Sequence, residues 1–304
     1  MVQQEMTTRH HDGSRGVANT ANGHAKGGKA RFDHIYNEPD PRPYFQTLEQ
    51  FGYEIPAHGQ SMFSLLVGEL REETGSEDLT VLDLCCSYGV NAALLNHRVT
   101  LDSLYERYRS PEVASLTSQD LADADAEFFR QLRRPSLLRV VGIDTADQAV
   151  AYAAQAGLLA KGSHENLENE DPSEGLNRHL AGVGLITVTG GIGYISEKTF
   201  ARVLDSAGAT PWVACFVLRW VSYEPFAAVL GSYGLVTEKL SNRTFRQRRF
   251  TDESERDYVL DELARIGIDP TAKEAEGHYH ADFYLSRPAA HARSRPLKEL
   301  ATGL

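Results

Sequence analysis

The sequence predicts an α/β fold with a doubly wound, mostly parallel sheet and an antiparallel C-terminal edge. Two observations lead to this prediction. Between residues 79 and 234, short apolar segments alternate with segments of helical periodicity, which is typical of a parallel sheet covered by helices. In the last third of the chain, several strand-like segments follow one another closely, which favours antiparallel strands at one edge of the sheet.

Four apolar segments are predicted as the parallel strands, and a predicted helix follows each of them. The strands are 80–85 (TVLDLC), 139–144 (RVVGID), 184–189 (GLITVT) and 211–218 (PWVACFVL), and the helices are 89–98, 147–159, 196–207 and 222–234. The last third of the chain predicts strands at 235–240, 244–250 and 279–288 around one helix at 253–267. Sites in such folds form at the carboxyl ends of the strands.

The other segments flank the domain predicted at 77–288 or lie within it. Residues 1–30 are rich in Gly, Asn, Thr, Ser and His and predict a disordered tail. Residues 31–76 are predicted as a helical N-terminal cap, and about 98–136 as a helical insertion between the first two strands. Residues 289–304 are polar and basic and predict a frayed C-terminal tail.

Composition and charge limit the class of protein. The formal net charge of −11 argues against a nucleic-acid partner, which needs clustered lysines and arginines. No apolar segment approaches the ~18 residues of a membrane helix, and the N-terminus lacks the apolar segment of a signal peptide. Only three cysteines are present. We therefore expect a reduced, cytoplasmic protein with no membrane and no nucleic-acid partner.

The segment VLDLCCSYGVNAALL, from Val81 to Leu95, predicts a buried strand that passes through a tight turn into a helix. The free N–H groups at the start of such a helix favour negative charge. The next strand ends in Asp144, whose carboxylate can accept both hydroxyl groups of a ribose. Asp144 follows Asp83 by 61 positions, far more than the usual ~20 after the glycine turn. A helical insertion explains this interval.

Three segments resemble the class I S-adenosylmethionine-dependent methyltransferases. They are VLDLCCSYGVNAALL, which resembles the glycine-rich first motif, VVGIDTADQAVAYAAQAGLL with its strand-ending acid, and GLITVTGGIGYISEKTF, which resembles the fourth-strand motif. The resemblance covers roughly residues 77–286. It implies a Rossmann-like fold with a reversed terminal strand pair, S-adenosyl-L-methionine as the cofactor, and methyl transfer as the reaction.

The resemblance also implies a set of cofactor contacts. The loop after the first strand would hold the amino-acid part of the cofactor, the acid of the second strand its ribose, the segment SHENLE its adenine, and the end of the fourth strand its sulfonium. The residues placed at these contacts are Asp83, Cys85, Ser87, Tyr88, Gly89, Asn91, Asp144, Asn166, Glu168, Thr189 and Gly190.

The first motif departs from the family pattern, because Cys85 and Ser87 stand where its first two glycines are expected. Both residues are small, and the backbone stays open to the cofactor if the turn keeps negative φ there. Gly89 remains at the position where a positive φ or close helix packing would be hardest to replace. We expect Cys85 and Cys86 to be packing groups, and we expect no metal site.

Three further side chains are candidates for the chemistry. Tyr194 follows the fourth strand, where its ring could meet the sulfonium or pack on the next helix. Arg219 ends the fifth strand and could hold a substrate carboxylate or cap the strand. His58, in the cap, could act as a base. The candidates for a substrate lid are Tyr36, Tyr44, His58, Tyr105 and Tyr108, with packing as the favoured interpretation for each.

These observations predict a methyltransferase of secondary metabolism that acts on a small molecule, by O- or N-methylation and with carboxylates among the candidate acceptors. No base constellation is evident, which fits an acceptor of modest pKa better than an alcohol or carbon. Two alternatives stay open. An enzyme of this fold could cyclise S-adenosylmethionine itself to azetidine-2-carboxylate and methylthioadenosine, and a non-catalytic protein could retain the fold. The aromatic cap could serve a homodimer.

Overall fold

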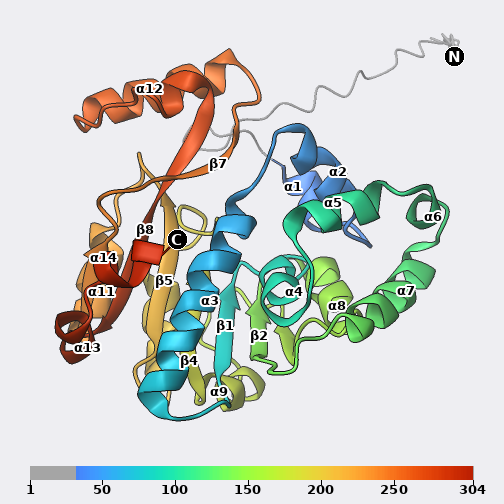
Figure 1. Ribbon diagram of the computed structural model, residues 1–304, viewed down its shortest axis with the longest axis horizontal. Helices are drawn as coiled ribbons and strands as arrows, with labels where there is room; N and C mark the ends of the chain where they lie inside the picture. Colours follow the sequence, from blue (N-terminus) through green and yellow to red (C-terminus); the bar gives the residue numbers. More distant parts are fainter. Residues whose placement is uncertain (1–31, 304) are drawn as a thin grey trace, which may run out of the picture.

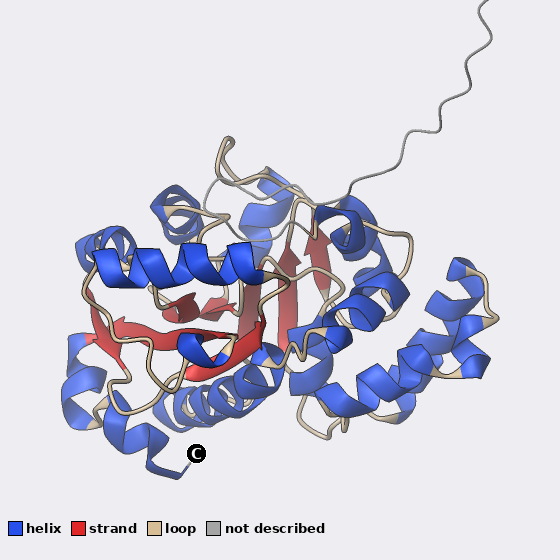
Figure 2. Cartoon of the chain, turned by 90° about the horizontal axis from the view of Figure 1, so that it is seen from above, coloured by secondary structure: helices blue, strands red, loops and turns tan. Residues whose placement is uncertain are grey.

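A computed structural model describes residues 32–303, so the tail predicted at 1–30 lies outside the described residues. Within the described chain, an eight-stranded sheet has the order β3-β2-β1-β4-β5-β8-β6, with β7 also paired to β8 (Figures 1 and 2). The first five strands are parallel, and β8 is antiparallel to β5, β6 and β7. The predicted mostly parallel sheet with an antiparallel C-terminal edge is confirmed. The strands are β1 (Thr80–Leu84), β2 (Arg139–Ile143), β3 (Lys161–Ser163), β4 (Val183–Val188), β5 (Trp212–Leu218), β6 (Leu235–Lys239), β7 (Phe245–Arg249) and β8 (His278–Pro288).

Helices cover both faces of the sheet, and the alternation of side chains along each strand explains why. Val81 and Val140 belong to one buried cluster, whereas their neighbours Leu82 and Val141 belong to a second. The first cluster packs under α3 (Ile55–Thr74), α4 (Val90–Asn96) and α8 (Asp147–Gln155), and the second under α9 (Glu174–Leu180), α10 (Glu197–Ser206) and α11 (Glu224–Ser232). The sheet is therefore doubly wound.

The N-terminal segment has two parts. Two short helices, α1 (Asp33–Tyr36) and α2 (Arg42–Gln50), lie near the end of the sheet to which β7 belongs, and α3 then runs along the sheet (Figure 1). Backbone hydrogen bonds join the turn before α3 to β7, from Glu54 N to Gln247 O at 2.8 Å and from Arg249 N to Phe51 O at 2.8 Å. These bonds place β7 beside the N-terminal cap.

The predicted insertion between β1 and β2 consists of α5 (Leu101–Arg109), α6 (Pro111–Ala114) and α7 (Ser118–Gln131). Its fully buried Asp125 accepts hydrogen bonds from the hydroxyls of Tyr108 and Tyr152, each at 2.6 Å, and pairs with Arg107 at 2.5 Å. The hydroxyl of Tyr105 donates to the backbone oxygen of Tyr53 at 2.6 Å. Tyr105 and Tyr108 are therefore packing residues, as favoured for these two lid candidates.

Two parts of the fold differ from the sequence prediction. The first is the unit of β3 and α9, which follows α8 and was not predicted. The second is the C-terminal segment, where the predicted fraying is wrong: α13 (Ala289–Ser294) and α14 (Leu297–Leu300) form, and Leu297 and Leu300 are buried. Burial of these two leucines holds a segment that otherwise looks polar. The helix α12 (Glu253–Arg265) agrees with its prediction.

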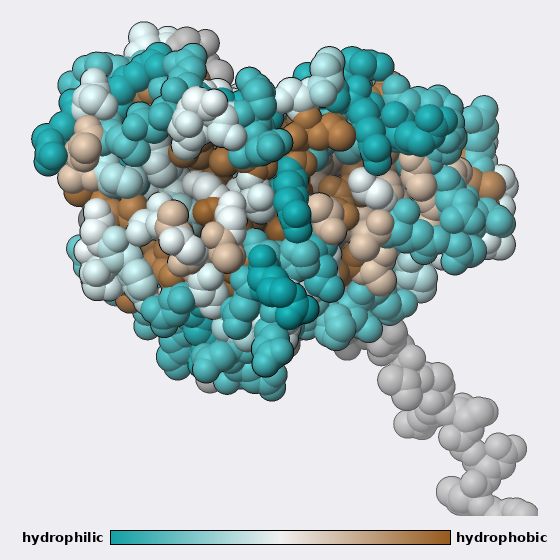
Figure 3. Space-filling model, turned by 90° about the horizontal axis from the view of Figure 1, so that it is seen from below, coloured by the Kyte–Doolittle hydropathy of each residue, from teal (hydrophilic) through white to brown (hydrophobic). Residues whose placement is uncertain are grey.

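On the face drawn in Figure 3, hydrophobic residues are visible in patches between hydrophilic ones. No helix within residues 32–303 is both long enough and apolar enough to cross a membrane.

Candidate functional site

A cavity of about 530 Å³ lies at the carboxyl ends of β1, β2 and β4. The loops after these strands contribute residues 85–87, 144–146 and 189–191, and the segment after β3 contributes residues 165–168. Residues of the N-terminal cap and of β7 complete the lining. Both the volume and the position at the strand ends are those of a small-molecule site.

The loop after β1 has a left-handed backbone. Cys85 has φ of 59° and Ser87 has φ of 47°, and Ala272 is the only other non-glycine residue with positive φ in the described chain. Our expectation of negative φ at Cys85 and Ser87 is therefore wrong. Such a conformation costs an L-residue roughly 1–2 kcal/mol, and backbone strain of this kind clusters at functional sites.

Hydrogen bonds to the end of β2 hold this strained loop. The backbone N–H groups of Cys85 and Cys86 donate to Ile143 O at 2.8 and 3.2 Å. The Asp144 carboxylate accepts from Ser87 N at 2.9 Å through Oδ2 and from Ala146 N at 3.0 Å through Oδ1. Burial raises the pKa of Asp144, although its backbone hydrogen bonds oppose that shift. Asp144 thus lines the cavity and also fixes the loop.

Asp83 lies behind the cavity wall at the end of β1. Its Oδ1 accepts hydrogen bonds from Asn91 Nδ2 at 2.8 Å and from Thr187 Oγ1 at 2.9 Å, and burial raises the pKa of this carboxyl to about 7. Asp83 Oδ2, Asn91 Oδ1 and Ser87 Oγ are buried without a hydrogen-bond partner among residues 32–303. Unpaired buried oxygens are costly in an otherwise well-formed structure, so these atoms indicate a place for a bound donor.

Gly89 has both properties that were predicted for it. Its φ is 73°, and an added Cβ would lie 3.1 Å from Ala153 Cβ and 3.3 Å from Leu158 Cβ. Gly89 does not itself line the cavity, so its role is to support the loop. Tyr88 also points elsewhere, since its hydroxyl accepts from Glu38 N at 2.9 Å and does not line the cavity. These positions correct the direct cofactor contacts expected for Tyr88 and Gly89.

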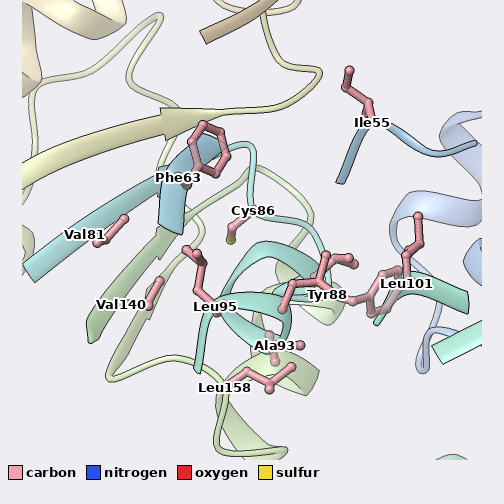
Figure 4. Packing of buried hydrophobic residues seen from close by; sticks show 14 of the residues in the cluster. Ile55, Phe63, Val81, Cys86, Tyr88, Ala93, Leu95, Leu101, Val140 and Leu158 are labelled. Atoms are coloured by element: carbon pink, nitrogen blue, oxygen red, sulfur yellow. The ribbon is translucent and has the colours of Figure 1, made fainter. Parts of the chain in front are cut away.

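The cysteines of the loop pack as expected. Cys86 lies among buried hydrophobic side chains (Figure 4), and a Cβ added to Gly142 would come within 2.7 Å of its sulfur. A Cβ on Gly191 would lie 2.5 Å from the Cys85 sulfur, which places Cys85 against the loop after β4. Burial raises the pKa of both thiols, so neither is a thiolate near neutral pH.

Asn166 and Glu168 line the cavity where the adenine was expected, but their polar atoms also hold the loop together. Asn166 Oδ1 accepts from Glu168 N at 3.0 Å. The Glu168 carboxylate accepts from Ser196 N at 2.8 Å and from Thr199 Oγ1 at 2.5 Å. Burial would raise the pKa of Glu168, yet these hydrogen bonds lower it. Glu168 therefore anchors the start of α10 to the cavity wall.

Thr189 and Gly190 lie where the loop after β4 meets the N-terminal cap. Thr189 Oγ1 accepts from Asn91 Nδ2 at 3.2 Å. A Cβ placed on Gly190 would lie 3.5 Å from the Tyr53 hydroxyl oxygen and 3.8 Å from Gln247 Nε2. The position expected near the sulfonium is thus bordered by Tyr53 of the cap and Gln247 of β7.

The three candidates for the chemistry occupy different places. Tyr194 lines the cavity with 58% of its surface exposed, as expected for the loop after β4. Arg219 does not line it, because it pairs with Glu274 at 2.5 Å and donates to Asp269 O at 2.9 Å. The substrate-anchoring role expected for Arg219 is therefore wrong.

His58 is also outside the cavity. Its ring packs at 5.4 Å from the ring of Phe245, and it borders a separate depression of about 50 Å³ with Arg243 and Phe245. The adjacent residue of α3, Gly59, is the one that faces Thr189, since its added Cβ would lie 3.0 Å from Thr189 Cγ2. One step along the helix turns His58 away from the site, which corrects its expected role as a base.

Sequence reasoning missed the contribution of β7 to the cavity. Gln247 and Arg248 are buried and line it, and Arg248 pairs with the buried Glu255 at 2.7 Å. Buried polar residues are unusual in a strand. The sequence signal that could have indicated this wall is the segment FRQRR, in which polar residues occupy four of the five strand positions. Phe32 and Tyr53 of the cap were missed as well.

Comparisons with known proteins found similar solved structures, whereas no protein-family model and no curated protein matches the chain. One similar structure is a TehB-like SAM-dependent methyltransferase from Corynebacterium glutamicum, with 13% identity, 72% of this chain and 85% of that chain covered, and a TM-score of 0.36. The YcgJ protein of Bacillus subtilis has 10% identity and a TM-score of 0.42, with 75% of this chain and 98% of that chain covered. The magnesium protoporphyrin IX methyltransferase of Synechocystis, solved with bound SAM, has 12% identity and a TM-score of 0.36, with 75% of this chain and 79% of that chain covered.

Proposed function

We propose that the protein is an S-adenosyl-L-methionine-dependent methyltransferase that acts on a small molecule by N- or O-methylation. The observation that carries this proposal is the cavity beside the left-handed loop, which combines a strand-ending acid with unpaired buried oxygens. Asp144 and the loop at Cys85 and Ser87 lie where the resemblance to class I methyltransferases places the cofactor.

The residues of the cavity fit this cofactor. Asn91 Oδ1 and Ser87 Oγ line the cavity and are acceptors for the ammonium of its amino-acid part, whereas the carboxyl group of Asp83 lies behind them and holds Asn91 in place. The Asp144 oxygens each accept one backbone N–H, and a carboxylate has about four lone-pair positions, so Asp144 retains capacity for the ribose hydroxyls. Glu168 and Asn166 would border the adenine.

When bound, S-adenosylmethionine supplies a methyl group that its sulfonium has already activated. The chain then has to orient the acceptor and limit the access of water, and orientation alone can contribute up to ~7–11 kcal/mol to lowering a barrier. Gly190 lies beside Tyr53 and Gln247, and these two residues border the path of an acceptor. The exposed Tyr194 lies at the mouth of the cavity.

The cyclisation alternative loses one of its supports. It relied on Tyr88 and Asn91 near the methionyl group, and the Tyr88 hydroxyl is engaged by the backbone of the cap. For the biological setting, we propose a cytoplasmic small-molecule methyltransferase of secondary metabolism. A homodimer through the N-terminal cap stays a prediction.

The experiment that tests the function separates the three possibilities by their products. The purified protein is incubated with S-adenosylmethionine alone and then with a pool of cell metabolites, and both adenosyl products are measured by mass spectrometry. A methyltransferase yields S-adenosylhomocysteine only with the pool, whereas cyclisation yields methylthioadenosine without any acceptor. A non-catalytic protein yields neither, and the absence of a thermal shift with the cofactor would overturn the proposal.

A further inference from the structure

The N-terminal cap and β7 form a part of the cavity that is lined by aromatic rings and by the buried side chain of Gln247. We propose that it binds a neutral aromatic amine as the methyl acceptor, held among Tyr36, Tyr44 and Tyr53 with an N–H group donated to Gln247 Oε1. This inference rests on the proposed methyltransferase function and specifies its substrate class.

The wall supplied by the cap is aromatic. Tyr36 and Tyr44 meet edge to face at 5.6 Å between ring centroids, and Tyr44 and Tyr53 do so at 6.5 Å. Phe32 adds a fourth ring to the lining. Such a wall favours a planar aromatic ligand, because aromatic pairs prefer offset or edge-to-face contact.

This wall lies next to the position expected for the transferred methyl group. An added Cβ on Gly190 would lie 3.5 Å from the Tyr53 hydroxyl oxygen and 3.8 Å from Gln247 Nε2. Gly190 is the residue that the resemblance places near the sulfonium. A ligand between Tyr53 and Gln247 would therefore lie within reach of the methyl group.

The charges of the lining disfavour an anionic acceptor. Its described residues include the acids Asp144, Glu165 and Glu168, no lysine and no histidine. Its single arginine, Arg248, forms two hydrogen bonds to the buried Glu255, at 2.7 and 2.9 Å, so its charge is already balanced. A carboxylate would have no free cation to pair with, and burial of an unpaired charge is strongly unfavourable.

Gln247 supplies the specific polar contact. Its Oε1 is buried and has no hydrogen-bond partner among residues 32–303, while its backbone oxygen accepts from Glu54 N at 2.8 Å. The backbone bond fixes the residue, and the free side-chain oxygen requires a donor. An N–H group of the bound substrate would donate a hydrogen bond to this oxygen. A substrate without an N–H or O–H group would leave the oxygen buried and unpaired, which costs free energy.

The same wall explains why the acceptor is an amine. Burial raises the pKa of Tyr36, Tyr44 and Tyr53, so none of the three is ionised near neutral pH to act as a base. A neutral aromatic amine needs no prior deprotonation. Its nitrogen lone pair forms the N–CH₃ bond while the S–CH₃ bond breaks and leaves its electron pair on sulfur. The positive charge passes to nitrogen beside the tyrosine rings, and the N–H proton is then lost to water.

The test measures binding by isothermal titration calorimetry to the full chain saturated with S-adenosylhomocysteine. The probes are three matched pairs with the same rings: 5-aminoindole and indole-5-carboxylate, 2-naphthylamine and 2-naphthoate, and 3-aminoquinoline and quinoline-3-carboxylate. We expect at least one amine to bind, and each bound amine to bind at least tenfold more tightly than its carboxylate. Gln247→Leu should weaken amine binding at least tenfold and leave the Kd for S-adenosylhomocysteine unchanged, whereas the exposed control Gln50→Leu should change neither.

The outcomes separate the two proposals. Failure of the chain to bind S-adenosylhomocysteine would overturn the methyltransferase function itself. Normal binding of S-adenosylhomocysteine together with no amine binding, equal binding of amines and carboxylates, or an unchanged amine affinity in Gln247→Leu would overturn only the substrate class. Mass spectrometry of a bound amine with S-adenosylmethionine should then show a product heavier by one methyl group.

Discussion

Asp144 accepts a hydrogen bond from the backbone N–H of Ser87 at 2.9 Å, and through this bond the acid at the end of β2 holds the left-handed loop that follows β1. The two residues follow the carboxyl ends of adjacent parallel strands, β1 and β2, which the helical insertion separates in sequence. One carboxylate therefore has two proposed roles, since it stabilises the loop and would bind the ribose. Substitutions at Asp144 should affect both stability and affinity.

Replacing Asp144 by alanine tests both roles. We expect Asp144→Ala to weaken S-adenosylmethionine binding roughly 10- to 150-fold, because loss of hydrogen bonds to a charged group costs roughly 1.5–3 kcal/mol. The free energy of unfolding should fall by about 1–2 kcal/mol, because Ser87 N and Ala146 N lose their acceptor. Calorimetric titration and urea denaturation measure the two effects. The exposed Asp147→Ala is the control, and an unchanged affinity in Asp144→Ala would mean that another residue binds the ribose.

Gly89 offers a separate test of why the loop retains one glycine. Gly89→Ala should lower the free energy of unfolding by about 2–4 kcal/mol, because it adds left-handed strain and a Cβ 3.1 Å from Ala153 Cβ. Gly52→Ala is the matched control, since Gly52 has φ of 61° but no atom within 4 Å of the added Cβ. It should lose only about 1–2 kcal/mol. Equal losses in urea denaturation would show that packing at Gly89 contributes nothing.

The core of the fold could be predicted because the hydrophobic pattern carries it. Strands β1, β2, β4 and β5 are apolar and buried, and the alternation of Val81 and Leu82 between two clusters follows from strand geometry. The position of Asp144 followed from the same pattern. The strand β3 could not be found this way, because its three residues, Lys161–Ser163, show no apolar pattern.

The features that sequence reasoning missed depend on distant contacts. The positive φ of Cys85 and Ser87 opposes their local preference and needs the hydrogen bonds from β2 to hold it. Gln247 joins the cavity only because β7 pairs with the distant β8 and with the cap. Arg219 was assigned to the site because it ends a central strand, but its partner Glu274 lies 55 residues further along the chain. Pattern and propensity carry no information on such pairings.

Ser87 should show a trade-off between stability and cofactor affinity. Ser87→Gly removes both a left-handed L-residue and a buried hydroxyl without a partner in the described chain, so we expect unfolding to cost about 1 kcal/mol more despite the entropy of glycine. Ser87→Ala removes the hydroxyl and keeps the strain, so its gain should be smaller. Both variants should bind S-adenosylmethionine several-fold more weakly. Thermal denaturation measures the change in stability, and calorimetric titration measures the change in cofactor affinity. If Ser87→Gly were less stable than the natural chain, the inferred backbone strain at Ser87 would be contradicted.

Arg219 should prove to be structural. Its side chain is 9% exposed and that of Glu274 is 1% exposed, so Arg219→Ala leaves a buried carboxylate without its partner and should cost about 3–5 kcal/mol of stability. The double variant Arg219→Met with Glu274→Leu should recover most of this loss. The control Arg265→Ala breaks an exposed ion pair with Glu262, and because solvent screens this pair the variant should be far less destabilised than Arg219→Ala. A large loss of cofactor affinity in Arg219→Ala, measured at a temperature where the variant is folded, would contradict this prediction and show that Arg219 contributes to cofactor binding.

Asp83 should give the protein a measurable dependence of stability on pH. Burial raises the pKa of Asp83 to about 7 in the folded state, above the ~3.9 of an unfolded aspartate. Between about pH 4 and 7 the folded chain therefore holds a proton that the unfolded chain has lost. Stability falls as pH rises through this window, and the full penalty is present above pH 7.

The variant Asp83→Asn isolates this effect. Asparagine keeps an oxygen for Asn91 Nδ2 and Thr187 Oγ1 but does not ionise, so the gain in stability of the variant over the natural chain should grow by about 2–3 kcal/mol as the pH rises from 5 to 8. Urea denaturation at several pH values measures the gain. The exposed Asp78→Asn, just before β1, is the control and should leave the profile unchanged. If the free energies of unfolding of Asp83→Asn and of the natural chain depended on pH in the same way, Asp83 would not change its protonation in this window.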